Sequence, residues 1–310
     1  MPQMTPAAAR VVDPILTTVA RGYRQAEAVG LLLFPRVYVS LRGGRTLQFG
    51  REDFTVYNTA RAPGTNTKRV QVGYLGEPYA LEDHSLEGLL PDEISGEAAA
   101  QGIDVQSRAL NAPLRALALE LEVAQATLAL NAAKYDSNHK VTLSGTDKWS
   151  NGASKPGAQV RSYREAVRQS IGVDPNTLVL APDSFNDLAE NPAVQDRFKY
   201  TSADSLTLAM AAAYFEVSRV VVGKAIRWNP ATQAMENVWG SGTAVLAYVP
   251  ANPQSYEEPS YGYTYTLDGM PLVRAGYRDE NAKSWAYPVD DVRGPAMTAM
   301  TAGFLIQGIH

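Results

Sequence analysis

Residues 36 to about 80 have the pattern of β-strands but too few apolar side chains to build a core. Apolar residues alternate with other residues around positions 37–41 and again around 70–74, a spacing typical of strands. Turn-forming residues at 61–64 separate the two runs. The pattern therefore predicts a long hairpin ribbon. Because such a ribbon is prone to aggregation when exposed, we expect it to lie on another molecule.

Charge is unevenly distributed along the sequence. Residues 1–75 contain ten Lys and Arg against four Asp and Glu, although the chain as a whole has a net charge of -4. Residues 77–107 contain eight acids and no Lys or Arg. A basic segment that precedes an acidic one predicts an attraction within or between chains. The alternative is that the two segments are solvated separately.

The clearest single element is a helix predicted over residues 113–135. Apolar residues recur at steps of three and four, and Pro113 is suited to a first helical turn. A helix of this length is a rod of roughly 35 Å. Further leucines and valines broaden the apolar stripe, which favours core packing over a coiled-coil seam.

Helix and strand patterns alternate in the next part of the chain. After a polar linker at 137–156, the sequence predicts a compact mixture of helices and strands. The expected helices are 163–171, 182–191 and 206–215, and the expected strands are 177–181, 219–222 and 245–249.

The C-terminal region returns to strict alternation. Tyr261, Tyr263 and Tyr265 are expected on one face of a strand, with a turn at 268–269 and a return strand from 272. A last apolar strand is expected at 302–309. We therefore expect the first and third regions to share strands, with the α/β part inserted between them.

Few residues have the spacing of an active site. The chain has no cysteine and three widely spaced histidines, and it lacks a phosphate-binding glycine loop and a serine-nucleophile motif. We expect no catalytic residue, cofactor or metal, and no membrane segment. Weaker alternatives are catalysis by adjacent acids and nucleobase stacking by the tyrosine row with Arg274 and Arg278. The adjacent acids are Glu52-Asp53, Asp92-Glu93, Glu257-Glu258 and Asp290-Asp291. Asp279-Glu280-Asn281 weakly suggests a cation loop.

Several segments, taken in order, resemble tailed-bacteriophage major capsid proteins. Residues 13–20 and Leu33-Phe34-Pro35 are similar to the N-terminal arm of that family, and Arg61-Ala-Pro-Gly64 to its extended loop. Residues 178–186 and 245–250 are similar to its axial domain. Each motif is weak alone, but together the motifs span nearly the whole chain, and their order and spacing make the resemblance specific.

The resemblance implies an α+β fold shared by tailed-phage capsids, encapsulins and the herpesvirus capsid floor. In that fold an N-terminal arm would take residues 1–35 and an extended β-hairpin loop residues 36–78. A peripheral domain with a long spine helix would take 79–157 and 255–310. An inserted axial domain would take 158–254.

The resemblance also implies a function. The chain would be a major capsid protein whose hexamers and pentamers form an icosahedral shell around the double-stranded DNA of a tailed phage. Expected partners are copies of itself, portal, scaffolding and decoration proteins, and DNA bound non-specifically. It would be found in the virion after assembly in the bacterial cytoplasm, with any scaffold a separate protein. Alternatives are an encapsulin-like compartment, a tail tube or sheath, and a soluble hydrolase using paired carboxylates.

In such a shell the basic loop is expected to lie across a neighbouring subunit and face its acidic segment. The candidate basic residues are Arg42, Arg45, Arg51, Arg61, Lys68 and Arg69. The candidate acidic residues are Glu82, Asp83, Glu87, Asp92 and Glu93.

Overall fold

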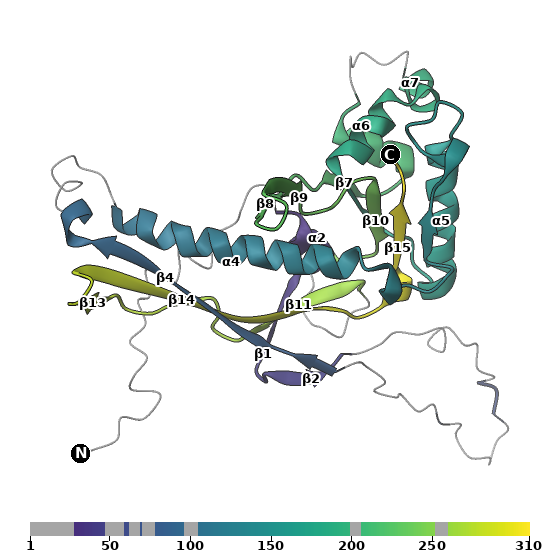
Figure 1. Ribbon diagram of the computed structural model, residues 1–310. Helices are drawn as coiled ribbons and strands as arrows, with labels where there is room; N and C mark the ends of the chain where they lie inside the picture. The colour runs from purple at the N-terminus through teal and green to yellow at the C-terminus, as the bar shows by residue number, and fades with distance from the viewer. Residues whose placement is uncertain are drawn as a thin grey trace.

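The chain folds into an elongated body with a compact lobe at one end (Figure 1). Helices and sheets are both present, which confirms the predicted α+β class. The computed structural model describes residues 28–46, 59–61, 69, 78–95, 105–198, 206–251 and 260–310. Residues 13–20, which resemble the N-terminal arm, and most of the predicted ribbon lie outside these residues.

A six-stranded sheet forms the elongated body and is organised around β14 (Ser284–Met297). On one side β14 pairs along ten residues with β4 (Glu82–Pro91), in antiparallel register. On its other side are β11 (Gly262–Leu267), β12 (Leu272–Val273) and β13 (Tyr277–Asp279). The edge strand β1 (Arg36–Val39) pairs in parallel with β11. The sharing of strands between the first and third regions is thus confirmed.

The long helix α4 (Val105–Ala129), called the spine helix below, lies along this sheet (Figure 1). Its buried residues Leu110, Leu114 and Leu117 pack against Val273 and Val289 of the sheet. The helix was predicted, but its limits were wrong. It begins ahead of the proline and ends before residue 135, where a short 3-10 helix (Ala132–Lys134) follows. The apolar stripe explains the early start, because Leu110 continues it by one turn and is buried.

The compact lobe contains a five-stranded sheet in the order β5-β15-β10-β6-β7. Its central strands are hydrophobic along their length, as expected for a sheet covered on both faces. The strands are β5 (Lys140–Thr142), β15 (Gly303–Gln307), β10 (Thr243–Ala247), β6 (Thr177–Leu180) and β7 (Arg219–Val222). The last strand of the chain therefore joins the sheet of the inserted region, a pairing that the sequence did not predict. The domain limits themselves remain predictions.

Helices surround this sheet and close the largest core. They are α5 (Pro156–Ile171), α6 (Pro182–Glu190), α7 (Pro192–Phe198) and α8 (Leu208–Phe215). The core includes the fully buried Trp149 and Phe215, whose rings stack with centroids 5.8 Å apart. Helices α6 and α8 match their predicted limits closely, whereas α5 begins seven residues before the predicted start at 163. The predicted linker 137–156, however, contains β5 and a 3-10 helix (Gly145–Asp147).

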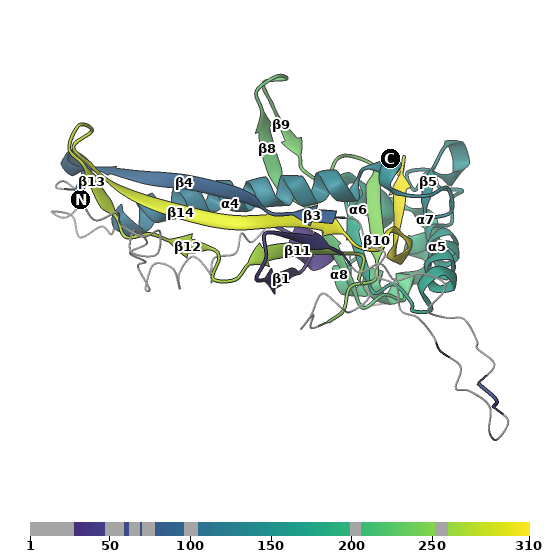
Figure 2. The same cartoon turned by 90° about the horizontal axis from the view of Figure 1, so that it is seen from below.

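Two small hairpins complete the described structure. β2 (Gly43–Arg45) pairs with β3 (Pro78–Ala80) at the base of the predicted ribbon. β8 (Ile226–Asn229) pairs with β9 (Ala234–Asn237), and this hairpin projects from the body (Figure 2). The hairpin β8–β9 was not predicted from the sequence. An added Cβ at Gly44 would lie 2.9 Å from the Tyr79 ring, so glycine permits a close approach there.

The tyrosine row of β11 behaves partly as predicted. Tyr263 and Tyr265 are fully buried with Val37 and Val39, which confirms their shared face. The turn at 268–269 is present, with Gly269 at a φ of 87°. The predicted return strand at 272–273 does not pair with β11. That prediction was wrong because β1 and β14 occupy the two edges of β11.

Short helices mark the two ends of the described chain. The helix α2 (Gly30–Leu33) packs beside α4, and a 3-10 helix (Met300–Ala302) precedes β15. Among the helices that the structure describes, none is both long and apolar enough to cross a membrane.

Candidate assembly surfaces

The acidic candidates, called the acidic row below, are spaced along an edge strand and the helical turn that follows it. Glu82, Asp83 and Glu87 are on β4, and Asp92 and Glu93 follow directly in a helical turn. Within the described part of the chain, β4 pairs only with β14, so its outer edge is not covered by another strand. Exposed edge strands are common sites for contact with other chains. Acidic side chains at this edge would select a basic partner.

Three of these acids also have partners within the chain. The Asp83 carboxylate accepts a hydrogen bond of 2.5 Å from Arg42. The Tyr277 hydroxyl donates to Glu87 at 2.9 Å, and this hydrogen bond is the main reason that the pKa of Tyr277 is raised. The Arg278 guanidinium forms two hydrogen bonds to Asp92, of 2.7 and 3.2 Å. The acidic row is therefore held in place by its own chain.

The basic candidates are only partly described. Arg42 and Arg45 lie at the base of the ribbon, where β2 meets β3. Arg61 and Arg69 are exposed. The remaining two, Arg51 and Lys68, lie outside the described residues. Two oppositely charged members of the predicted contact set, Arg42 and Asp83, form an ion pair within the chain.

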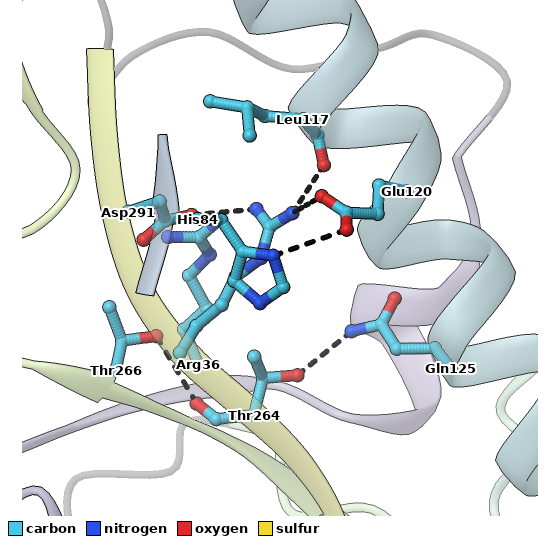
Figure 3. Close-up of polar contacts among 9 residues, drawn as sticks. Arg36, His84, Leu117, Glu120, Gln125, Thr264, Thr266 and Asp291 are labelled. Carbon is cyan, nitrogen blue, oxygen red and sulfur yellow. Dashed lines mark hydrogen bonds and ion pairs between the residues drawn. The ribbon is translucent and has the colours of Figure 1, made fainter. Parts of the chain in front are cut away.

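A second group of polar residues lies between α4 and the sheet (Figure 3). Arg293 of β14 is 2% exposed and donates hydrogen bonds to Asp291 at 2.6 Å and to the Leu117 carbonyl at 2.5 Å. Arg36 of β1 donates to the same Asp291 carboxylate at 3.2 Å. One buried acid thus holds two arginines from two strands, and one of these arginines binds the helix backbone.

Glu120 connects this group to solvent. Its carboxylate is half-exposed and lies 3.6 Å from Arg293 and 3.2 Å from the His84 ring nitrogen. Burial is the largest influence on Arg293 and lowers its pKa, whereas the Asp291 charge opposes that effect. The cluster, defined as Arg36, His84, Glu120, Asp291 and Arg293, joins the spine helix to three strands.

Glu122 forms a third polar junction, two residues further along α4. Its carboxylate is 2% exposed and accepts hydrogen bonds from the main-chain N–H groups of Val29 and Gly30, at 2.9 to 3.1 Å. It also accepts one of 2.7 Å from the Trp239 indole. The side chain therefore ties the residues before α2, the spine helix and the compact lobe together. Glu122 and Arg293 were not among the residues predicted from the sequence. The sequence does show Glu122 as a carboxylate directly beside the apolar stripe of the helix.

The alternative chemistries find little geometric support among the described residues, and the predicted acid pairs Glu52-Asp53 and Glu257-Glu258 lie outside them. Asp290 and Asp291 point to opposite faces of β14, where Asp290 binds Ser85 and Arg274. Asp291 binds the buried Arg293 and the partly buried Arg36. They therefore do not form a carboxylate dyad. Base stacking by the tyrosine row was a wrong alternative, since Tyr261, Tyr263 and Tyr265 are fully buried.

The remaining site alternatives involve cations. The Asp279 side chain accepts hydrogen bonds from the main-chain N–H groups of Asn281 and Ala282, so it stabilises the turn after β13. No group of three or more His, Asp or Glu suited to a metal ion occurs among the residues with described positions.

Comparison with known proteins gives a consistent result. Residues 134–286 match the family described as phage major capsid protein E. The chain is 33% identical over 306 residues to the major capsid protein of Burkholderia phage BcepMu, covering 97% of each sequence. It is 44% identical to a phage-related protein from Bordetella bronchiseptica RB50 whose crystal structure is known. That match has a TM-score of 0.86 and covers 97% of this chain and 98% of the other.

A more distant match concerns the fold alone. An encapsulin from Synechococcus elongatus PCC 7942 is 12% identical, with a TM-score of 0.55, over 99% of this chain and 90% of the encapsulin chain. The fold is therefore shared between virus shells and protein compartments. Sequence identity over the full length, rather than the fold, separates these two possibilities.

Proposed function

Because the chain belongs to the family of phage major capsid proteins, we propose that it assembles as hexamers and pentamers into an icosahedral shell around the double-stranded DNA of a tailed phage. The observation that carries this proposal is the 33% identity to the BcepMu major capsid protein over 97% of both sequences. Portal, scaffolding and decoration proteins would join the shell in the host cytoplasm. DNA would be held by non-specific contacts, and the protein would have no catalytic activity.

Assembly requires each subunit to offer two different surfaces to its neighbours. Closed rings form by head-to-tail contacts, in which a surface of one copy meets a different surface of the next. The acidic row of β4 is one such surface, exposed along a strand edge. The basic ribbon supplies the second surface, with Arg61 and Arg69 exposed beyond its base.

The charges would set the register of this contact rather than supply most of its energy. Exposed ion pairs contribute little each, because water and salt screen them. Burial of apolar side chains contributes more of the binding free energy. Leu86 and Leu89 lie in the same strand as the acids of β4, and their exposed fractions are 43% and 57%. A neighbouring ribbon that covers β4 would bury them.

The test combines charge reversal with electron microscopy. Arg61→Glu with Arg69→Glu is expected to reduce shell formation while the subunit stays folded, because the reversed charges repel β4. The matched control is Arg115→Glu with Lys155→Glu, which reverses the same number of positive charges at exposed positions outside the ribbon. Normal shells from the first variant would contradict the charge-matching contact.

The same micrographs separate the alternative functions. Closed shells with copurified enzyme cargo would indicate an encapsulin-like compartment, and open tubes a tail protein. A small oligomer with saturable turnover would indicate a hydrolase. Closed shells without cargo proteins support the capsid proposal.

A further inference from the structure

The hairpin β8–β9 has no strand partner in the rest of the described structure. It forms a separate two-stranded sheet between Ile226 and Asn237 and projects away from the body (Figure 2). A two-stranded hairpin by itself is only marginally stable in water. One side of this hairpin therefore needs a surface to pack against.

The side of the hairpin that faces the spine helix is polar. Arg227 and Glu236 lie opposite each other in the two strands and form an ion pair at 3.4 Å. Both line a hollow of about 440 Å³ whose opposite wall includes Val123 and Thr127 of α4. Asn229 extends the polar side and donates a hydrogen bond of 2.7 Å to Glu236.

The side that faces away is apolar. Trp228 and Met235 are directly paired across the strands, and Ile226 is two residues from Trp228, so all three lie on one face. They are 57%, 60% and 49% exposed. We call these three residues the hairpin apolar face. The usual orientation of an amphipathic hairpin is thus reversed, with the polar side toward the protein and the apolar side toward solvent.

We infer that the hairpin apolar face packs against a second copy of this chain in the assembled shell. The inference rests on the proposed function, which surrounds every subunit with identical neighbours. The face includes no lysine or arginine, so it is unsuited to a nucleic-acid backbone. Projection from the body, seen in Figure 2, places it where an adjacent copy can reach it.

A head-to-tail contact also needs a different apolar surface on the receiving copy. The described chain also exposes large apolar side chains on other elements, including Val173 directly after α5 and Leu208 of α8 in the compact lobe. Each copy therefore carries both an apolar projection and apolar surface elsewhere. This combination fits a heterologous contact between copies.

The first test is a matched pair of substitutions on neighbouring residues of β9. Met235→Lys places a charge on the hairpin apolar face, whereas Ala234→Lys places the same charge on the polar side. We expect a several-fold loss of shells from Met235→Lys and near-normal yield from Ala234→Lys. Circular dichroism and thermal unfolding should show that both variants are folded. Equal yields from the two variants, whether normal or reduced, would overturn the inference.

The second test is the structure of wild-type particles by cryo-electron microscopy. Trp228 and Met235 are expected to be buried against a neighbouring subunit. A closed shell in which they remain exposed to solvent would overturn this inference and leave the proposed function intact. Failure of the wild-type protein to form shells would instead contradict the proposed function, and with it the inference.

Discussion

Gly88 of β4 and Pro113 of the spine helix meet at one main-chain carbonyl, that of Ala109. Proline has no N–H, so position 113 cannot donate the usual helical hydrogen bond to this carbonyl. An added Cβ at Gly88 would lie 2.0 Å from the Ala109 oxygen and 3.4 Å from the Pro113 ring. The glycine therefore lets the strand approach the helix at the point where the helix lacks a hydrogen bond.

This relationship predicts that Gly88→Ala separates the helix from the sheet. Overpacking of this kind costs roughly 1–3 kcal/mol of unfolding free energy. Denaturant unfolding of the unassembled subunit measures it. The control is Gly43→Ala, also in a strand, where an added Cβ would be at an ordinary 3.5 Å from its nearest neighbour. Equal stability of the two variants would argue against the close approach.

Replacement of Arg293 by Met should destabilise the subunit by about 3 kcal/mol, because loss of one partner leaves a buried charge poorly compensated. Asp291 would retain Arg36 but lose its shorter hydrogen bond, and the Leu117 carbonyl would lose a donor. Arg278→Met removes an exposed ion pair with Asp92 and should change the unfolding free energy little. A similar loss in both variants would show that burial does not matter here.

Glu122→Gln tests the junction between the spine helix and the compact lobe. The substitution turns one acceptor oxygen into an NH₂ donor that faces other donors, at a cost of roughly 1–3 kcal/mol. Glu120→Gln, two residues away and half-exposed, should cost much less. Chemical unfolding compares the two. If Glu122→Gln is as stable as the wild type, the carboxylate is not needed at the junction.

The hairpin β8–β9 should weaken in acid through Glu236. Hydrogen bonds, first from Asn229 and then from Thr232, together with Arg227, hold the pKa of Glu236 below its ordinary value. The resulting stabilisation is present above the ordinary pKa and is lost as pH falls through the lowered value. A side-chain NMR titration should show the pKa rising in Asn229→Ala. An unchanged pKa would mean that Asn229 does not stabilise the carboxylate.

Elements with strong local patterns could be predicted from the sequence. The spine helix follows from its apolar stripe, and β6 and β7 follow from short runs of aliphatic residues. The burial of Tyr263 and Tyr265 follows from alternation alone. In each case one stretch of sequence contains the whole signal.

Features that depend on distant partners could not be predicted. The length of β4 is set by pairing with β14, about 200 residues later in the chain. The sequence of β4 by itself indicates an acidic segment and not a long strand. Arg293 looks like any strand arginine until α4 and Asp291 surround it. The hairpin β8–β9 has its apolar side toward solvent, so a pattern search based on an internal core passes over it.

The position of β15 has a consequence for synthesis of the chain. This strand lies between β5 and β10, and Phe304, Leu305 and Ile306 fill the core of the compact lobe. The sheet therefore cannot close until residues 303–307 have left the ribosome. A translation product that stops short of them would expose the edges of β5 and β10 and an open core.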